Sequence, residues 1–285
     1  METARKAYDF LGGEKLYQQR AREVLPILVR QAKAAQKIYY SNLAEEVGIP
    51  NPRNLNYPLG SIGNALKSLS KKLKIEIPQI QCIVVNKGTE LPGEGIGWFI
   101  DKTDFKKLTT KQKNEIVNRV LSEIFAFDKW DEVLAALDLK PTLHNSIIKD
   151  AVKKAGLKYG HGGESEHHKK LKNQIMANPS LIGIDSGYDS KPEYLLPSAD
   201  TVDILFRSDK EWVGVEVKSH ISSQEDILRG LFQCVKYQAL LEAYLAVSDD
   251  NKNVKVFLAI GGPFPPELIP VKNVLGINVV DNIKV

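Results

Sequence analysis

Two apolar segments separated by a short polar turn constrain the fold of this chain more than any other feature. Thr201–Phe206 and Glu211–Ser219 are rich in β-branched and aromatic residues, and the tetrapeptide Arg-Ser-Asp-Lys lies between them. Apolar runs of this length joined by a tight polar turn are typical of a β-hairpin. Such a hairpin would place Asp203 opposite residues 214–216.

The second of these strands carries a carboxylate and an ammonium group. Glu216 and Lys218 are two residues apart and therefore project from the same face of a strand. With Asp203 across the hairpin, two carboxylates and one ammonium would converge on one point. Hydrolysis of a phosphodiester needs such a group, because carboxylate-bound Mg²⁺ neutralises the phosphate and activates water. The lysine can orient the water or stabilise charge in the transition state.

The helix expected next, Asp226–Ala246, adds a polar stripe. Arg229, Gln233 and Tyr237 are spaced four residues apart and so fall on one helix face. This stripe could face the site and contact metal-bound water or phosphate. Apolar residues occupy the other side of the helix.

The order Asp203, Glu216-Val217-Lys218, Gln233 and Tyr237 resembles the PD-(D/E)xK, or restriction-endonuclease-like, nuclease superfamily over roughly residues 146–260. The resemblance implies that Asp203 and Glu216 bind the metal and that Lys218 is the catalytic lysine. It also implies that Mg²⁺ is the cofactor, with Mn²⁺ able to substitute. Val202 stands where the motif has its proline, a position that varies widely in the superfamily.

Many members of this superfamily place a further Glu on the helix before the hairpin. Glu164 and Glu166 both compete for that role, and Glu164 is favoured because it lies two turns before Leu171 on the inward face. A helix capped by Ser165 would leave Glu164 outside the helix. The neighbouring His161, His167 and His168 are interpreted as a surface helix start, because adjacent histidines point in different directions.

The N-terminal part shows the element order of a winged helix-turn-helix. The expected elements are a helix over 13–34, a short β-run at 38–40, helices over 41–48 and 59–73, a strand over 80–85, a Gly-rich loop over 87–97 and a β-run at 98–100. Residues 15–100 resemble the DNA-binding domain of alkylguanine-DNA alkyltransferases and alkyltransferase-like proteins. Gln79-Ile80-Gln81 stands in place of the methyl-accepting Cys-His-Arg, Gly60 replaces the base-displacing arginine, and Cys82 is expected in the core. The resemblance therefore implies DNA docking without alkyl transfer.

Charge supports that interpretation only locally. The whole chain carries a formal charge of +4, whereas residues 1–75 contain thirteen Lys or Arg against six Asp or Glu. A local basic excess attracts phosphate by counterion release, but on charge alone a solvated helix face is the preferred interpretation. The residues expected to contact DNA are Tyr40, Arg53, Lys67, Lys71, Lys72, Arg229 and Tyr237. A winged helix used for protein contact or dimerisation remains the alternative for this part.

These features predict an α/β fold: a restriction-endonuclease-like mixed sheet flanked by helices, preceded by a winged helix-turn-helix domain. The expected parts are the winged-helix domain at 1–102, a helical connector at 103–145 and the nuclease domain at 146–285, which begins with helices over 146–155 and 164–178. No apolar run long enough for a membrane span and no signal-peptide core is evident, and the two cysteines form no disulfide pattern. We expect a cytoplasmic protein.

The predicted function is a metal-dependent DNA endonuclease, and the pairing of domains would suit restriction or phage defence. A structure-specific repair or recombination nuclease and a non-catalytic DNA- or protein-binding factor are the alternatives. Double-strand cleavage often needs two active sites, which is consistent with a homodimer. The intact Asp203, Glu216 and Lys218 argue against a decayed site.

Overall fold

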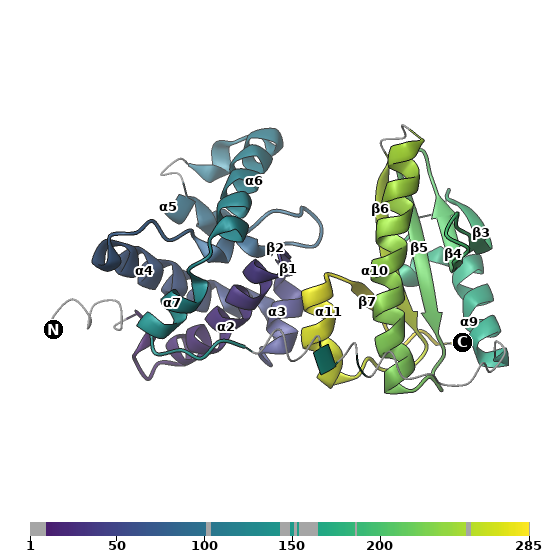
Figure 1. Cartoon of the computed structure of the whole chain (residues 1–285), viewed down its shortest axis with the longest axis horizontal. Helices are drawn as coiled ribbons and strands as arrows, with labels where there is room; N and C mark the ends of the chain where they lie inside the picture. The colour runs from purple at the N-terminus through teal and green to yellow at the C-terminus, as the bar shows by residue number, and fades with distance from the viewer. Residues whose placement is uncertain are drawn as a thin grey trace. The chain divides into compact units, whose positions relative to one another are not determined.

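The computed structural model describes residues 10–100, 104–142, 149–150, 153, 165–185, 187–248 and 252–284. The chain divides into two compact units, Met1–Asn145 (unit 1) and Ser146–Val285 (unit 2) (Figure 1). The expected helix at 146–155 falls largely outside the described residues. None of the described helices combines the length and the apolar character needed to cross a bilayer.

Unit 1 is mainly helical. Its elements are α2 (Leu16–Lys33), β1 (Ile38–Tyr39), α3 (Tyr40–Glu46), α4 (Asn56–Leu73), β2 (Val84–Val85), α5 (Gly97–Ile100), α6 (Thr110–Ala126) and α7 (Trp130–Ala136), with short 3-10 turns between them. The two short strands pair in parallel, Ile38 with Val84 and Tyr39 with Val85. The helices form because their apolar residues repeat at helical spacing and bury one face of each helix.

One core joins all of unit 1. Residues 103–145, which were expected to form a separate connector, contribute α6 and α7 to the same apolar cluster as α2 and α4. Trp130 of α7 is 1% exposed, and its ring N–H donates to the carbonyl of Ile124 at 3.0 Å. The helical pattern of this segment was recognisable, but its packing partners were not.

The expected wing differs from the structure in two places. Ile80–Ile83 is a 3-10 turn, so only Val84–Val85 of the expected strand pairs as β structure. Trp98, Phe99 and Ile100 belong to the short helix α5 rather than to a strand. Among the described residues of this region, the strand pair of a wing is therefore absent.

Unit 2 is a mixed α/β unit built on a five-stranded sheet. The strands β3 (Asp189–Leu195), β4 (Thr201–Arg207), β5 (Glu211–Lys218), β6 (Asn253–Ile260) and β7 (Asn278–Val280) lie in that order across the sheet. β3, β4 and β5 pair antiparallel, and β5, β6 and β7 pair parallel. The predicted hairpin is β4–β5, whereas β3 was not predicted, because it is mostly exposed and contains Pro192.

Helices cover both faces of this sheet. α10 (Gln224–Val247) and α11 (Ile269–Leu275) pack on one face, with Leu228, Leu231 and Leu241 of α10 against the sheet. α9 (Glu166–Ala177) packs on the other face through Leu171 and Ile175. Figure 1 shows α10 and α9 on opposite sides of the strands. The β4–β5 hairpin is therefore held rigidly between two helical layers.

Candidate active site

The register of the β4–β5 hairpin brings Asp203 next to Glu216. Ile204 pairs with Val215, so Asp203 lies one step further along, across from Glu216. The Asp203 Oδ2 accepts a hydrogen bond from the Val217 backbone N–H at 2.8 Å. The Asp203 carboxylate is thus fixed at the residue between Glu216 and Lys218.

The regular alternation of β4 breaks at Asp203. Val202 packs in the core under α10, whereas Ile204, two residues later, packs in the core under α9. On the neighbouring strand, Tyr194 pairs with Val202 and Pro192 with Ile204, while Glu193 between them has a left-handed φ of 51°. This local distortion lets Asp203 turn toward β5 instead of standing on one face of the sheet.

Glu216 and Lys218 form a largely buried ion pair beside Asp203. Glu216 is only 3% exposed, and its Oε1 accepts from Lys218 Nζ at 2.8 Å. Lys218 Nζ also donates to Gln233 Oε1 of α10 at 3.3 Å. The ammonium is therefore placed by one partner from its own strand and one from the covering helix.

The electrostatics of this group favour a cation. Burial, together with the neighbouring Asp203 carboxylate, raises the pKa of Glu216 to about 7, although Lys218 acts in the opposite direction. A buried carboxylate next to a second carboxylate is stabilised by a positive charge placed between them. Among the described residues, no three His, Cys, Asp or Glu side chains are already arranged around one metal position. The donor types and the charge of Asp203 and Glu216 nevertheless fit a hard divalent cation such as Mg²⁺.

These residues open into a cavity of about 470 Å³. Its lining also includes residues that the sequence analysis did not assign to the site: His168, Glu193, Ser219, Ser222 and Asp226. The His168 Nε2 of α9 lies 3.6 Å from Asp203 Oδ1. His168 lies three and seven residues before the buried Leu171 and Ile175, and this spacing could have placed it on the inward face.

Of the two candidate helix carboxylates, the structure describes only Glu166, and its side chain is exposed. Ser165 caps α9 by accepting from the His168 N–H at 3.2 Å, so the helix begins at Glu166. Glu164 lies outside the described residues and precedes this cap, so helical spacing no longer gives it an inward position. The Glu166 side chain is 80% exposed and lies 3.9 Å from Lys169. His168 is thus the described residue of α9 that reaches the acidic pair.

The three residues of the polar stripe on α10, Arg229, Gln233 and Tyr237, make different contacts. Gln233 contacts Lys218, as described above, and its Nε2 lies 3.4 Å from the Tyr237 hydroxyl. Tyr237 is 4% exposed and donates to the Thr201 carbonyl at 2.9 Å, so it anchors α10 to β4 and is not available for the expected DNA contact. Arg229 is half-exposed and pairs with Asp226 at 3.1 Å, at the edge of the cavity.

The expected DNA-contacting residues of unit 1 do not form one group. Arg53 is exposed in the turn before α4, whereas Lys71 and Lys72 are exposed in its last turn. About 22 Å of helix separates these ends at 1.5 Å per residue. Tyr40 is half-buried, and its hydroxyl accepts from the Gly93 N–H at 3.2 Å.

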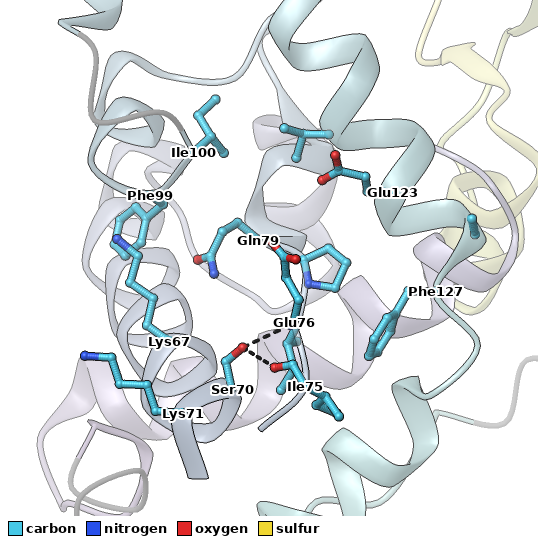
Figure 2. Close-up of a pocket in the computed structure, with 14 residues that line it drawn as sticks. Lys67, Ser70, Lys71, Ile75, Glu76, Gln79, Phe99, Ile100, Glu123 and Phe127 are labelled. Carbon is cyan, nitrogen blue, oxygen red and sulfur yellow. Dashed lines mark hydrogen bonds between the residues drawn. The ribbon is translucent and has the colours of Figure 1, made fainter. Parts of the chain in front are cut away.

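Lys67 belongs to a second pocket, of about 870 Å³, which also includes Lys71 and Gln79. Figure 2 shows the Lys67 side chain running toward the Phe99 ring, and its Nζ lies 4.5 Å from the centre of that ring. The same Nζ donates to the Trp98 carbonyl at 2.6 Å. Lys67 thus ties α5 to α4. This pocket is larger than the cavity lined by Asp203, Glu216 and Lys218, and its charged residues are Lys67, Lys71, Glu76 and Glu123.

In comparisons with known proteins, no family model, curated protein or solved structure matches this chain.

Proposed function

We propose that this protein is a metal-dependent nuclease that hydrolyses phosphodiester bonds of DNA. The observation that supports it most is the convergence of Asp203, Glu216 and Lys218 in one cavity of unit 2. A hairpin that only needed stability would gain little from burying two adjacent carboxylates and an ammonium, because desolvating them is costly. Their placement is easier to explain by a bound cation and an anionic substrate.

In this proposal Asp203 and Glu216 hold Mg²⁺, and His168 takes the place expected for the helix carboxylate. The bound cation would neutralise the phosphate and increase the acidity of a water molecule. Lys218, held by Glu216 and Gln233, directs its ammonium toward the charge that develops on the phosphate. Mn²⁺ has similar ligand preferences and should substitute for Mg²⁺.

Unit 1 is proposed to bind the DNA. Its support is the excess of basic residues in the first 75 positions and the exposure of Lys71 and Lys72 at the end of α4. Phosphate contacts of this kind give affinity without sequence preference. A role of unit 1 in protein contact would leave duplex affinity unchanged when these lysines are removed.

The test is incubation of the full chain with plasmid, linear, nicked and single-stranded DNA, and with RNA, in Mg²⁺, Mn²⁺ or EDTA. We expect cleavage of at least one DNA substrate in either metal, none in EDTA, and only a residual rate, at least ~100-fold below wild type, for Lys218→Ala. Cleavage that persists in EDTA, or in Lys218→Ala at the wild-type rate, would refute the proposed site. The panel also separates a general endonuclease from a structure-specific nuclease.

A further inference from the structure

A glycine in the second turn of α10 lies directly against the lysine of the proposed active site. Gly230 is buried within a helix of 24 residues. Glycine lowers helix stability relative to alanine, so a buried glycine inside a long helix needs a reason in its surroundings. The neighbours of Gly230 supply that reason.

The space beside Gly230 is filled by the stem of Lys218. A Cβ atom at position 230 would lie 3.0 Å from Lys218 Cε and 2.8 Å from Leu258 Cδ1. Both distances are shorter than ordinary van der Waals contact, so any larger residue would force one of these side chains to move. Because residue 230 has no side chain, the Lys218 stem can lie directly beside the backbone of α10 at this position.

The ammonium group at the end of the Lys218 stem contacts Gln233. Gly230 and Gln233 are three residues apart and share one face of α10. Gln233 Oε1 is 3.3 Å from Lys218 Nζ, and Glu216 Oε1 completes the pair of acceptors at 2.8 Å. α10 therefore contacts Lys218 twice: the four-carbon stem packs beside Gly230, and the ammonium group donates a hydrogen bond to Gln233.

We propose that Gly230 is a positioning residue that fixes the Lys218 ammonium over the cavity; this inference rests on the nuclease function proposed above. Lysine side chains have many rotamers, and a catalytic group loses efficiency when it samples them. Gly230→Ala displaces the Lys218 stem and moves its ammonium, already 3.3 Å from Gln233 Oε1, out of hydrogen-bond range of that acceptor. Asp203 and Glu216 keep their own backbone positions in the sheet.

The experiment is a double-mutant cycle in single-turnover cleavage at saturating DNA, with wild type, Gly230→Ala, Lys218→Ala and the double variant. We expect Gly230→Ala to slow cleavage at least ~10-fold without changing the apparent Kd for DNA, and to have no further effect when Lys218 is already alanine. An equal slowing in both backgrounds would overturn the inference, as would a wild-type rate for Gly230→Ala.

Leu258 provides the matched control, because it is the other side chain that a Cβ at position 230 would strike. In Gly230→Ala/Leu258→Ala the clash with Leu258 is gone, and we expect the rate to stay low. Recovery of the wild-type rate would show that Leu258, and not Lys218, senses the added methyl group. Mn²⁺ affinity measured by calorimetry should be the same in wild type and Gly230→Ala.

A structural measurement separates this inference from the proposed function. If the wild-type protein cleaves no substrate, the nuclease proposal fails, but the position of Lys218 can still be measured. A crystal structure of Gly230→Ala should then show Lys218 Nζ out of hydrogen-bond range of Gln233 Oε1. An unchanged Lys218 in that structure would overturn the inference about Gly230.

Discussion

The Asp203 carboxylate accepts a hydrogen bond from the backbone N–H of Val217, at 2.8 Å, between the two other residues of the candidate site. The pairing of β4 with β5 ends at Ile204 and Val215, and beyond it one oxygen of Asp203 supplies the acceptor for the Val217 N–H. The side chain that is proposed to bind metal also completes the backbone hydrogen bonding of β5. Charge and hydrogen bonding at this position can therefore be separated by mutation.

Asp203→Asn and Asp203→Ala should both abolish cleavage, with a rate loss of at least ~100-fold, because neither supplies an anionic ligand. Their stabilities should differ. The asparagine oxygen can still accept from Val217 N–H, whereas alanine leaves this buried donor unpaired, at a cost of about 1–3 kcal/mol. Urea unfolding in EDTA measures the difference. Equal stability of the two variants would show that this hydrogen bond contributes nothing.

In the metal-free protein, the contribution of Glu216 to stability should fall as pH rises from about 4.5 to 7. The pKa of Glu216 is raised to about 7, chiefly by burial, so the folded state binds a proton that the unfolded state has already lost. The contribution of Glu216 to the free energy of unfolding is therefore highest at low pH, where Glu216 is protonated in both states. Above pH 7 the ionised Glu216 lowers the free energy of unfolding by a constant amount of up to ~3 kcal/mol.

Glu216→Gln removes this titration and is the matched variant for that measurement. We expect its stability in EDTA to vary less with pH between 4.5 and 7 than that of wild type. Mg²⁺ should raise the melting temperature of wild type at pH 8 and leave Glu216→Gln nearly unchanged. Parallel pH profiles for the two proteins would contradict the assignment.

Gln233→Ala should slow cleavage about 10-fold or more, which is ~1.4 kcal/mol of transition-state stabilisation, because Lys218 loses one of its two acceptors. The melting temperature should change little. Gln238→Ala is the control on the same helix, since the Gln238 amide contacts Glu242 and the Val254 carbonyl instead of the site. A wild-type rate for Gln233→Ala would remove Gln233 from the site.

Lys71→Ala/Lys72→Ala should weaken binding to duplex DNA without changing the chemical step at saturating DNA. Each phosphate-binding ammonium that is removed should make the slope of log K against log salt shallower by about 0.9, so the loss of both should change it by about 1.8. Fluorescence anisotropy at several salt concentrations measures this slope, with Lys255→Ala of β6, an exposed lysine of unit 2, as a single-lysine control. An unchanged slope would favour a protein-binding role for unit 1.

Both thiols should resist alkylation and disulfide reagents in the folded protein. Cys82 and Cys234 are 0% exposed, and burial raises the pKa of Cys82 to about 12. A thiol reacts as its thiolate, so the reactive form is scarce as well as inaccessible. Titration with Ellman's reagent should detect essentially no thiol before unfolding and both thiols in guanidinium chloride. Rapid labelling of native Cys82 would contradict its place in the core.

The hairpin and its site could be predicted from sequence because the information is local. A polar turn between two apolar runs sets the register, and the register alone places Asp203 across from Glu216. Gln233 was recognisable for the same reason, since four-residue spacing on a helix defines a face. The general class of unit 2, a mixed sheet with helices on both sides, also follows from the order of the elements.

The remaining features depend on packing between segments distant in the chain. His168 is close to Asp203 only because α9 covers that face of the sheet, and the histidine run alone looked like a solvated helix start. β3 was not predicted because an exposed edge strand with a proline lacks the apolar alternation of a buried one. Tyr237 matched a motif in spacing, but its burial against Thr201 could not be read from one helix.

The central place of β5 has a consequence for how the candidate site would be lost. Glu216 and Lys218 sit in a strand whose backbone is paired on both sides, with β4 and with β6. Amide groups in such a strand exchange with solvent mainly when the whole sheet opens, and not by fraying at an edge. Hydrogen exchange at Val213, Gly214 and Val215, which pair with both β4 and β6, should therefore report global unfolding of unit 2. Destabilising changes elsewhere in this unit would then reduce the number of active molecules rather than the rate of each one.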